Sequence, residues 1–320
     1  MSNTAVKKQK KKININLFAI IVFALLILYT LSFILPLLWG LMTTFKCEQD
    51  FNVMKNVIGL PNISLWEKDF DHKGNIFGNY IIAFKNMNYE ARAKYLAGVF
   101  IKRYITSQKQ ITFWSSMINT FVLTIGCSLF FLAATVLTGY VCAKYRYWFS
   151  DVVYGVVIFT MVLPITGTTP ALIKLLKDLS LYNTLIGMCL GAATFYSMYF
   201  LIFYGFFMDL PNTYNEAAEI DGASQFSVMI KICIPLASKM MTTVMLLRFV
   251  HNWNDYATAL YFLPTKATLA YTIFHVTQKI AQSVPRKLAI LYVLALPILL
   301  LFVFTKKRLM GNISIGGIKE

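Results

Sequence analysis

The chain has 320 residues, of which 58% are hydrophobic and 14% are charged, and it carries a formal net charge of +16. This composition excludes a soluble globular protein, because no soluble core could bury so much apolar surface. The charge does not indicate nucleic-acid binding, since five lysines precede the first apolar run and Lys306, Lys307 and Arg308 follow the last, as at cytosolic ends of membrane helices.

Six apolar segments are long enough, or nearly so, to cross a hydrocarbon core of about 30 Å. They cover residues 17–41, 113–143, 152–173, 179–208, 240–263 and 288–305. The sequence therefore predicts an all-α, polytopic membrane protein with six transmembrane helices. We expect a basic cytosolic tail at 1–12, the first transmembrane helix within 13–41, an extracytoplasmic loop or cap at 42–112, a five-helix core at 113–305 and a cytosolic tail at 306–320.

The basic residues at the two ends also predict the orientation of the chain. An even number of spans puts both termini on one side of the membrane, and the positive-inside rule makes that side the cytosol. The loop at 42–112 is basic as well, but loops longer than about 60 residues are largely exempt from this rule.

The long loop after the first span alternates turn residues with a more regular stretch. Residues 89–104 have the pattern of an amphipathic helix, whereas the preceding residues are rich in glycine, asparagine and proline. The loop is either a small ordered cap outside the membrane or a flexible insertion.

The third span contains PITGTTP at residues 164–170, with two prolines around a glycine and three threonines. A helix broken at membrane depth often lines a transport site, because protein or water must satisfy the freed backbone groups. The alternative is a simple proline kink near the outer end of the span.

The cysteines and histidines do not form a recognisable metal site. Cys47, Cys127, Cys142, Cys189 and Cys233 have no CxxC spacing, and we interpret them as small buried hydrophobic residues. His72 and His275 are isolated, so no metal is expected.

An acidic loop separates the fourth and fifth spans. Thr213 and Glu216 have the spacing of a capping box, which predicts that a short helix begins there. Gly222 suits the left-handed position that ends such a helix. A second helical piece is expected at 226–232, and Pro235 is expected to close it before the next span.

The residue types of this loop admit two interpretations. Ala217 and Ala218 allow another backbone to approach closely, and the carboxylates of Glu216, Glu219 and Asp221 give a fixed charge pattern that could fit the groove of a partner. Alternatively, the acids only cap a helix and keep the loop solvated.

The loop resembles the signature of the permease subunits of bacterial ATP-binding-cassette importers. That signature is EAA, three residues, Gly, nine residues and I-x-L-P, and the chain matches it from Glu216 to Pro235 with Ile234 in place of Leu. The loop is most similar to the carbohydrate-importing, maltose-transporter branch. Further similar segments are LLWGLMTTFK, WSSMINTFVLTIG, TGYVCAKYRY, LSLYNTLIGMCL, FVHNWNDYATAL and KRLMGNISIGGIKE, whereas the loop at 62–112 is longer than the family leads us to expect.

The resemblance implies a type I importer permease fold in which residues 209–238 form a cytosolic coupling loop that docks on an ATPase. It assigns this contact to Glu216, Ala217, Ala218, Asp221, Gly222, Ala223, Ile232, Ile234 and Pro235. It implies a second, related permease chain, two cytosolic ATPase subunits and an extracytoplasmic solute-binding protein as partners in a bacterial cell membrane. The chain has no G-x-x-x-x-G-K-[ST] phosphate loop, so we expect ATP and Mg on the partner ATPase, no cofactor on this chain and no enzymatic activity of its own.

The fifth span carries a polar stripe. Arg248, Asn252 and Asp255 are spaced i, i+4 and i+7 and share one helical face, with His251 beside them. A mid-membrane arginine costs about 2.5–3.5 kcal/mol on insertion scales and normally faces water or protein. Arg248 therefore either lines a solute pathway or satisfies neighbouring helices.

The segment Asn252, Trp253, Asn254 and Asp255 also resembles a family motif. Asn and Asp can hydrogen-bond to sugar hydroxyls and Trp can stack on a sugar ring, so we expect these residues and Arg248 to line half of the pathway for a sugar or oligosaccharide. The alternative function is an ion-coupled secondary carrier of small polar solutes. That function requires carboxylates within the spans, and only Asp255 qualifies.

Overall fold

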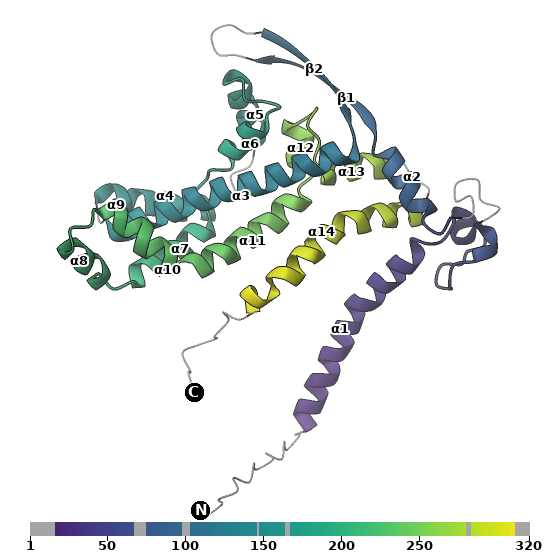
Figure 1. Cartoon of the computed structure of the whole chain (residues 1–320), viewed down its shortest axis with the longest axis horizontal. Helices are drawn as coiled ribbons and strands as arrows, with labels where there is room; N and C mark the ends of the chain where they lie inside the picture. The colour runs from purple at the N-terminus through teal and green to yellow at the C-terminus, as the bar shows by residue number, and fades with distance from the viewer. Residues whose placement is uncertain are drawn as a thin grey trace, which may run out of the picture. The chain divides into compact units, whose positions relative to one another are not determined.

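The computed structural model describes residues 17–66, 75–97, 103–145, 147–163, 167–279 and 283–310. The chain divides into two compact units, Met1–Asn79 with Ser283–Ala289, and Tyr80–Gln282 with Ile290–Glu320. The described part is mostly helical and contains one two-stranded sheet (Figure 1). The predicted tail at 1–12 and the end of the chain after residue 310 lie outside the described residues.

The first unit begins with helix α1 (Leu17–Thr43), which is apolar along its whole length and has Pro36 inside it. Its side chains from Phe18 to Leu38 are all exposed in the single chain. A helix this long and this apolar can cross a membrane, and its surface is suited to lipid or to other membrane helices.

The described residues directly after α1 fold into a small cap, so this part of the loop is ordered. The cap contains a π-helix η1 (Gln49–Val53), a 3-10 helix η2 (Ile63–Leu65) and the start of helix α2 (Gly78–Asn86). The Asn79 side chain donates hydrogen bonds to the carbonyls of Thr44 and Lys46, both at 2.7 Å. Burial lowers the pKa of the Lys46 ammonium, and the charge of Asp50 opposes this shift.

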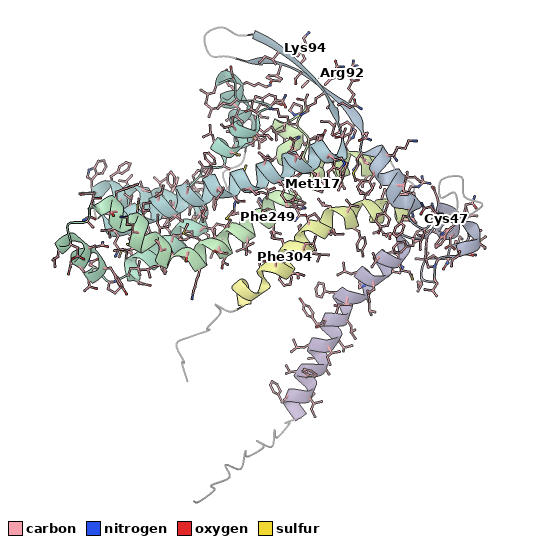
Figure 2. The ribbon with its side chains drawn as sticks, viewed as in Figure 1. Cys47, Arg92, Lys94, Met117, Phe249 and Phe304 are labelled. Atoms are coloured by element: carbon pink, nitrogen blue, oxygen red, sulfur yellow. The ribbon has the colours of Figure 1, made fainter. Side chains whose placement is uncertain are left out.

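The predicted amphipathic helix at 89–104 is wrong, and with it the all-α assignment. Strands β1 (Tyr89–Ala97) and β2 (Arg103–Ile111) form an antiparallel hairpin in the second unit. Ala91 is buried, whereas Glu90, Arg92 and Lys94 are exposed or nearly so, so the apolar pattern has the period of two that a strand requires. In Figure 2, Arg92 and Lys94 lie along β1. Alanine, glutamate, lysine and arginine are good helix formers, and their frequency in this segment favours a helix although residues 91, 93 and 95 share one face of a strand.

The rest of the second unit is helical, and its last helix, α14, begins within the residues 283–289 that belong to the first unit. Figure 1 shows α3 and α11 running side by side through it, with α8 at one end. The helices are α3 (Phe113–Lys144), α4 (Trp148–Val162), α5 (Thr168–Asp178), α6 (Leu185–Gly191), α7 (Met198–Asp209), α8 (Thr213–Ile220), α9 (Gln225–Val228), the π-helix η3 (Met229–Cys233), α10 (Ile234–Leu236), α11 (Ser238–Asn254), α12 (Ala257–Phe262), α13 (Leu269–Lys279) and α14 (Val284–Met310).

The prediction of six spans is only partly supported. Among the described residues, three helices are long and apolar enough to cross a membrane, namely α1, α3 and α14. The helix at 225–236 and helix α11, whose axes differ by 70°, make a fourth candidate if the two count as one span. The segments at 152–173, 179–208 and 240–263 are each divided between two helices. Part of the PITGTTP segment, residues 164–166, lies outside the described residues.

Polar contacts join two of the turns between these helices. Asn183 has a left-handed backbone with φ 60°, and its buried side chain donates to Thr265 Oγ1 at 2.7 Å and accepts from the Thr265 backbone N–H at 3.2 Å. The Asn183 N–H donates to the carbonyl of Phe262 at 3.0 Å. These bonds join the turn before α6 to the turn after α12.

Helix α3 packs closely on α7 because Gly139 faces α7. A Cβ atom at this position would lie 3.1 Å from Phe203 Cβ and 3.3 Å from the Tyr204 backbone nitrogen. Phe203 is fully buried in the cluster at this contact. Small residues at helix interfaces allow backbones to approach in this way in membrane proteins.

We expect Gly139→Ala to lower the free energy of unfolding by about 1–3 kcal/mol relative to Gly155→Ala, because overpacked helix contacts cost about this much. Gly155 lies on α4, where a Cβ atom would have nothing within 4 Å, so it controls for the change in helix propensity. Thermal unfolding of both purified variants measures the difference, and equal stability of the two would show that the α3–α7 contact tolerates the methyl group.

Candidate functional site

The loop between α7 and α11 contains the predicted helix, sharp turn and second helix. Helix α8 ends where Gly222 has a left-handed φ of 77°. The Ala223 N–H donates to the Ala218 carbonyl at 2.9 Å, which closes the end of the helix. The Ser224 side chain then accepts from the Ser227 N–H at 3.3 Å and caps α9.

Pro235 lies one residue before the end of this second piece, close to the end that the sequence predicted. Pro235 lies inside α10, and the chain continues into α11 after a bend of 70° between the two parts. A proline lacks the N–H that would bond to the carbonyl four residues earlier in an α-helix, and the π-helix η3 directly before it accommodates that loss.

The predicted coupling residues divide into an inner and an outer group. Ala218 is buried in a cluster with Val228, Met229 and Cys233, and Ala223, Ile232 and Ile234 pack against it. The outer group is exposed and consists of Glu216, Ala217, Asp221, Gly222 and Pro235. The inner group therefore fixes the shape of the loop, and the outer group is available to a partner.

Two exposed apolar residues of this surface are not among the predicted coupling residues. Ile220 is 86% exposed and Phe226 is 69% exposed, on either side of the Gly222 turn. Apolar side chains of this size at the tip of a loop are suited to contact with another molecule. The signal in the sequence is an isoleucine and a phenylalanine that flank a turn within an otherwise polar segment.

The loop is attached to the end of α3 by polar contacts that no sequence pattern indicated. The Lys144 ammonium donates to the Leu210 carbonyl at 2.8 Å and to Asn212 Oδ1 at 3.1 Å. The Tyr145 hydroxyl donates to Gln225 Oε1 at 3.0 Å. These contacts hold α8 and α9 to the second membrane helix, so that the loop can move with it.

A cavity of about 230 Å³ lies further along α3 and α11. Its polar lining consists of Arg248, His251, Asn252, Asp255 and Thr258, and the remaining lining consists of Leu123, Cys127, Leu172, Met188, Gly191, Ala192 and Phe262. The structure thus brings together Arg248, Asn252 and Asp255 with their predicted neighbour His251 around one space.

Arg248 is held by an aromatic ring instead of a carboxylate. Its guanidinium carbon lies 4.1 Å from the centroid of the Phe131 ring. The Arg248 Nε is buried without a hydrogen-bond partner, and within the described residues Arg248 makes no ion pair. A cation on an aromatic face keeps much of its charge available, so Arg248 can bind a further group in the cavity.

Asn252 and Asp255 each have one structural contact. Asn252 Nδ2 donates to Ser128 Oγ at 3.2 Å, which joins α11 to α3. Asp255 accepts from the Thr258 backbone N–H at 3.0 Å and from the Thr258 hydroxyl, and so caps the start of α12. This cap also explains why the predicted span at 240–263 is interrupted after Asn254.

Trp253 and Asn254 do not line this cavity, in contrast to the prediction. Trp253 is fully buried, stacks on Phe249 at 5.7 Å between ring centroids, and donates its indole N–H to the Leu294 carbonyl at 3.1 Å. Asn254 is exposed and donates to the Val250 carbonyl at 2.9 Å. Adjacent helix positions lie about 100° apart, so residues next to Asn252 face other directions.

The five cysteines are buried and free, as interpreted from their spacing. Within the described residues, no group of three or more His, Cys, Asp or Glu side chains could hold a metal ion. His72 lies outside those residues.

The second unit has membrane helices around a partly polar cavity, and an exposed loop is rigidly attached at one end of them. These features define the membrane-spanning subunit of a transporter. Residues 135–307 match the family "Binding-protein-dependent transport system inner membrane component", and the chain belongs to that family. Membership argues against the ion-coupled secondary carrier that the sequence left as an alternative.

Several curated proteins resemble the chain. The diacetylchitobiose uptake system permease protein NgcG of Streptomyces coelicolor is 25% identical over 311 residues, covering 93% of this chain and 88% of that protein. The melibiose/raffinose/stachyose import permease protein MelC of Bacillus subtilis is 23% identical, covering 72% and 86%. The sn-glycerol-3-phosphate transport system permease protein UgpE of Escherichia coli K12 is 26% identical over a match that spans 45% of this chain and 51% of UgpE.

The fold also has a solved counterpart. A chain of a bacterial ABC transporter involved in the import of the acidic polysaccharide alginate superimposes with a TM-score of 0.66 and 21% identity, covering 92% of this chain and 98% of that one. The chain therefore has the fold of an ABC importer permease.

Proposed function

We propose that the chain is one of two permease subunits of an ATP-driven importer and forms half of the pathway for a sugar or oligosaccharide. The family and the names of NgcG and MelC support this assignment. The partners are a related permease chain, two cytosolic ATPase subunits that bind ATP and Mg, and an extracytoplasmic solute-binding protein. Both termini lie in the cytosol of a bacterial cell, and the chain itself carries out no covalent chemistry.

The attachment of the exposed loop to α3 and α11 is the observation that carries this proposal. Lys144 and Tyr145 attach the loop to the end of α3. The same helix contributes Cys127 to the cavity. Cys127 and Lys144 are about 26 Å apart along the helix, at a rise of about 1.5 Å per residue. Helix α11 follows the loop directly and contributes Arg248. A displacement of the loop by a closing ATPase therefore moves two walls of the cavity, which is the basis of alternating access.

The chemistry of the cavity fits a polar, uncharged or weakly charged solute. Asn252 and Asp255 retain acceptor capacity beyond their structural bonds, and Arg248 and His251 can donate. Hydroxyl groups of a carbohydrate can pair with all four side chains. The second permease chain would supply the opposite wall, because one chain forms only part of the pathway.

Uptake into proteoliposomes tests this function. The complete transporter, with a labelled oligosaccharide that its binding protein retains, is expected to accumulate sugar only when both ATP and the binding protein are present. An Asp255→Asn variant is expected to shift the relative uptake of different sugars, because the amide changes an acceptor into a donor. Accumulation driven by an ion gradient without ATP would contradict the proposal.

A further inference from the structure

The cap that follows α1 buries two charged residues and exposes several large apolar ones. Lys46 and Asp50 are 0% and 1% exposed, whereas Ile58 and Leu60 are 82% and 79% exposed. Val53, Met54 and Ile63 are also more than half exposed. A segment that folds in water has the opposite distribution, so residues 53–63 are built to contact an apolar surface.

This apolar surface is rigid because the buried polar groups hold its backbone. The Lys46 ammonium donates to the carbonyls of Asn56 and Val57 at 2.6 and 3.1 Å. The Asp50 carboxylate accepts from Asn56 Nδ2 at 2.9 Å and from the Asn62 N–H at 3.0 Å. Backbone groups that are bonded inward in this way can approach lipid, where water no longer satisfies them.

One hydrogen bond fixes the depth of the segment along α1. The Trp39 indole N–H donates to the Val57 carbonyl at 2.8 Å. Trp39 lies 22 residues after Leu17, which is roughly 33 Å along a helix, close to the hydrocarbon thickness of about 30 Å. Trp39 therefore lies where interfacial aromatic residues are enriched, and Val57 lies beside it. In Figure 1 the chain after α1 folds back beside the end of this helix.

The charge of the segment fits the same position. Lys55 is its only charged residue between 51 and 66, and it is exposed at a turn where its backbone is left-handed, with φ 53°. A lysine at the level of the headgroups can extend its ammonium to lipid phosphates while the neighbouring apolar side chains enter the acyl region.

We infer that residues 53–63 form an interfacial membrane anchor in which Val53, Met54, Ile58, Leu60 and Ile63 enter the lipid leaflet at the far end of α1. The surface is continuous with the lipid-exposed length of α1 and is displayed by a rigid polar core. The anchor fixes the cap against the membrane and so sets the position of α1 along the bilayer normal. The inference depends on α1 crossing the membrane and does not depend on the solute.

Depth-dependent fluorescence quenching tests the anchor. The complete transporter is placed in nanodiscs of phosphatidylcholine and phosphatidylglycerol, with an environment-sensitive fluorophore on Ile58→Cys or, separately, on Leu60→Cys. Gln108→Cys on the exposed face of the hairpin is the control, and the unsubstituted chain measures labelling of the five native cysteines, which are all buried.

Nitroxide lipids labelled near the headgroup are expected to quench the fluorophore at both cap positions at least about twofold more than at the control position. Aqueous iodide is expected to quench it about twofold less at the cap positions than at the control position. Iodide quenching equal to that of the control would overturn the anchor. Protection from both quenchers would also overturn it, because a partner protein would then cover the surface instead of lipid.

Discussion

Gly222→Val is expected to reduce ATP-driven uptake by at least about tenfold, which corresponds to about 1.4 kcal/mol, while leaving the amount of protein in the membrane unchanged. Gly222 has a φ of 77°, and a β-branched residue held in this region costs about 1–3 kcal/mol. A Cβ at Gly222 has nothing within 4 Å, so the loss arises from the backbone of the turn and not from crowding. Transport and ATP hydrolysis in proteoliposomes measure the effect.

A graded series separates conformation from surface contact. Asn tolerates the left-handed region better than Ala, and Ala better than Val, so uptake should fall in the order Gly, Asn, Ala, Val. The matched control is Gly155→Val on α4. At Gly155 nothing lies within 4 Å of a Cβ atom, and φ is not positive. A smaller loss for Ala than for Asn would mean that bulk at the partner surface matters and that the turn conformation does not.

Arg248→Met is expected to lower uptake by about tenfold or more without lowering the thermal stability of the purified transporter. Methionine has a similar length, can pack on Phe131, and removes a charge whose placement in a membrane costs about 2.5–3.5 kcal/mol. Because Arg248 makes no ion pair in the described part of the chain, its removal leaves no buried carboxylate without a partner. Uptake rates and apparent melting temperatures are measured on the same preparations.

The control for this variant is Lys239→Met, which removes a positive charge from the exposed start of the same helix. It should leave uptake near that of the unsubstituted chain. If Arg248→Met instead melts at a clearly lower temperature and loses transport in proportion, Arg248 supports the packing of α3 and α11 and does not serve the solute.

Length and hydropathy predicted the membrane helices that are continuous. Helices α1, α3 and α14 lie close to their expected positions because a long apolar run has no competing structure in lipid. A break or kink was expected in the third span, at PITGTTP, but the breaks in the fourth and fifth spans were not expected, because hydropathy adds up residues and does not detect a cap. The bond of Asp255 to Thr258 lies at the break in the fifth span, and the bond of Asn183 to Thr265, which joins two turns, links residues far apart in the sequence.

The helical period predicted which polar residues share the cavity. Arg248, Asn252 and Asp255 lie together because their spacing of four and three residues keeps them on one face. The prediction for Trp253 depended on a resemblance of four consecutive residues, and consecutive residues on a helix face different directions. The attachment of the loop by Lys144 and Tyr145 could not be predicted from the sequence. A lysine in the last turn of a helix is already explained by its favourable interaction with the helix dipole, so it does not indicate a contact with a distant loop.

Photo-crosslinking from the exposed loop tests the central claim most directly. A benzoylphenylalanine in place of Phe226 or of Ile220 is activated in the complete, working transporter, with Gln108 on the hairpin as the control position. Both loop positions are expected to form adducts with the ATP-hydrolysing subunit, with yields that change when nucleotide is added, and the hairpin position should form none with it. Absence of ATPase adducts from both loop positions throughout the transport cycle would contradict the account.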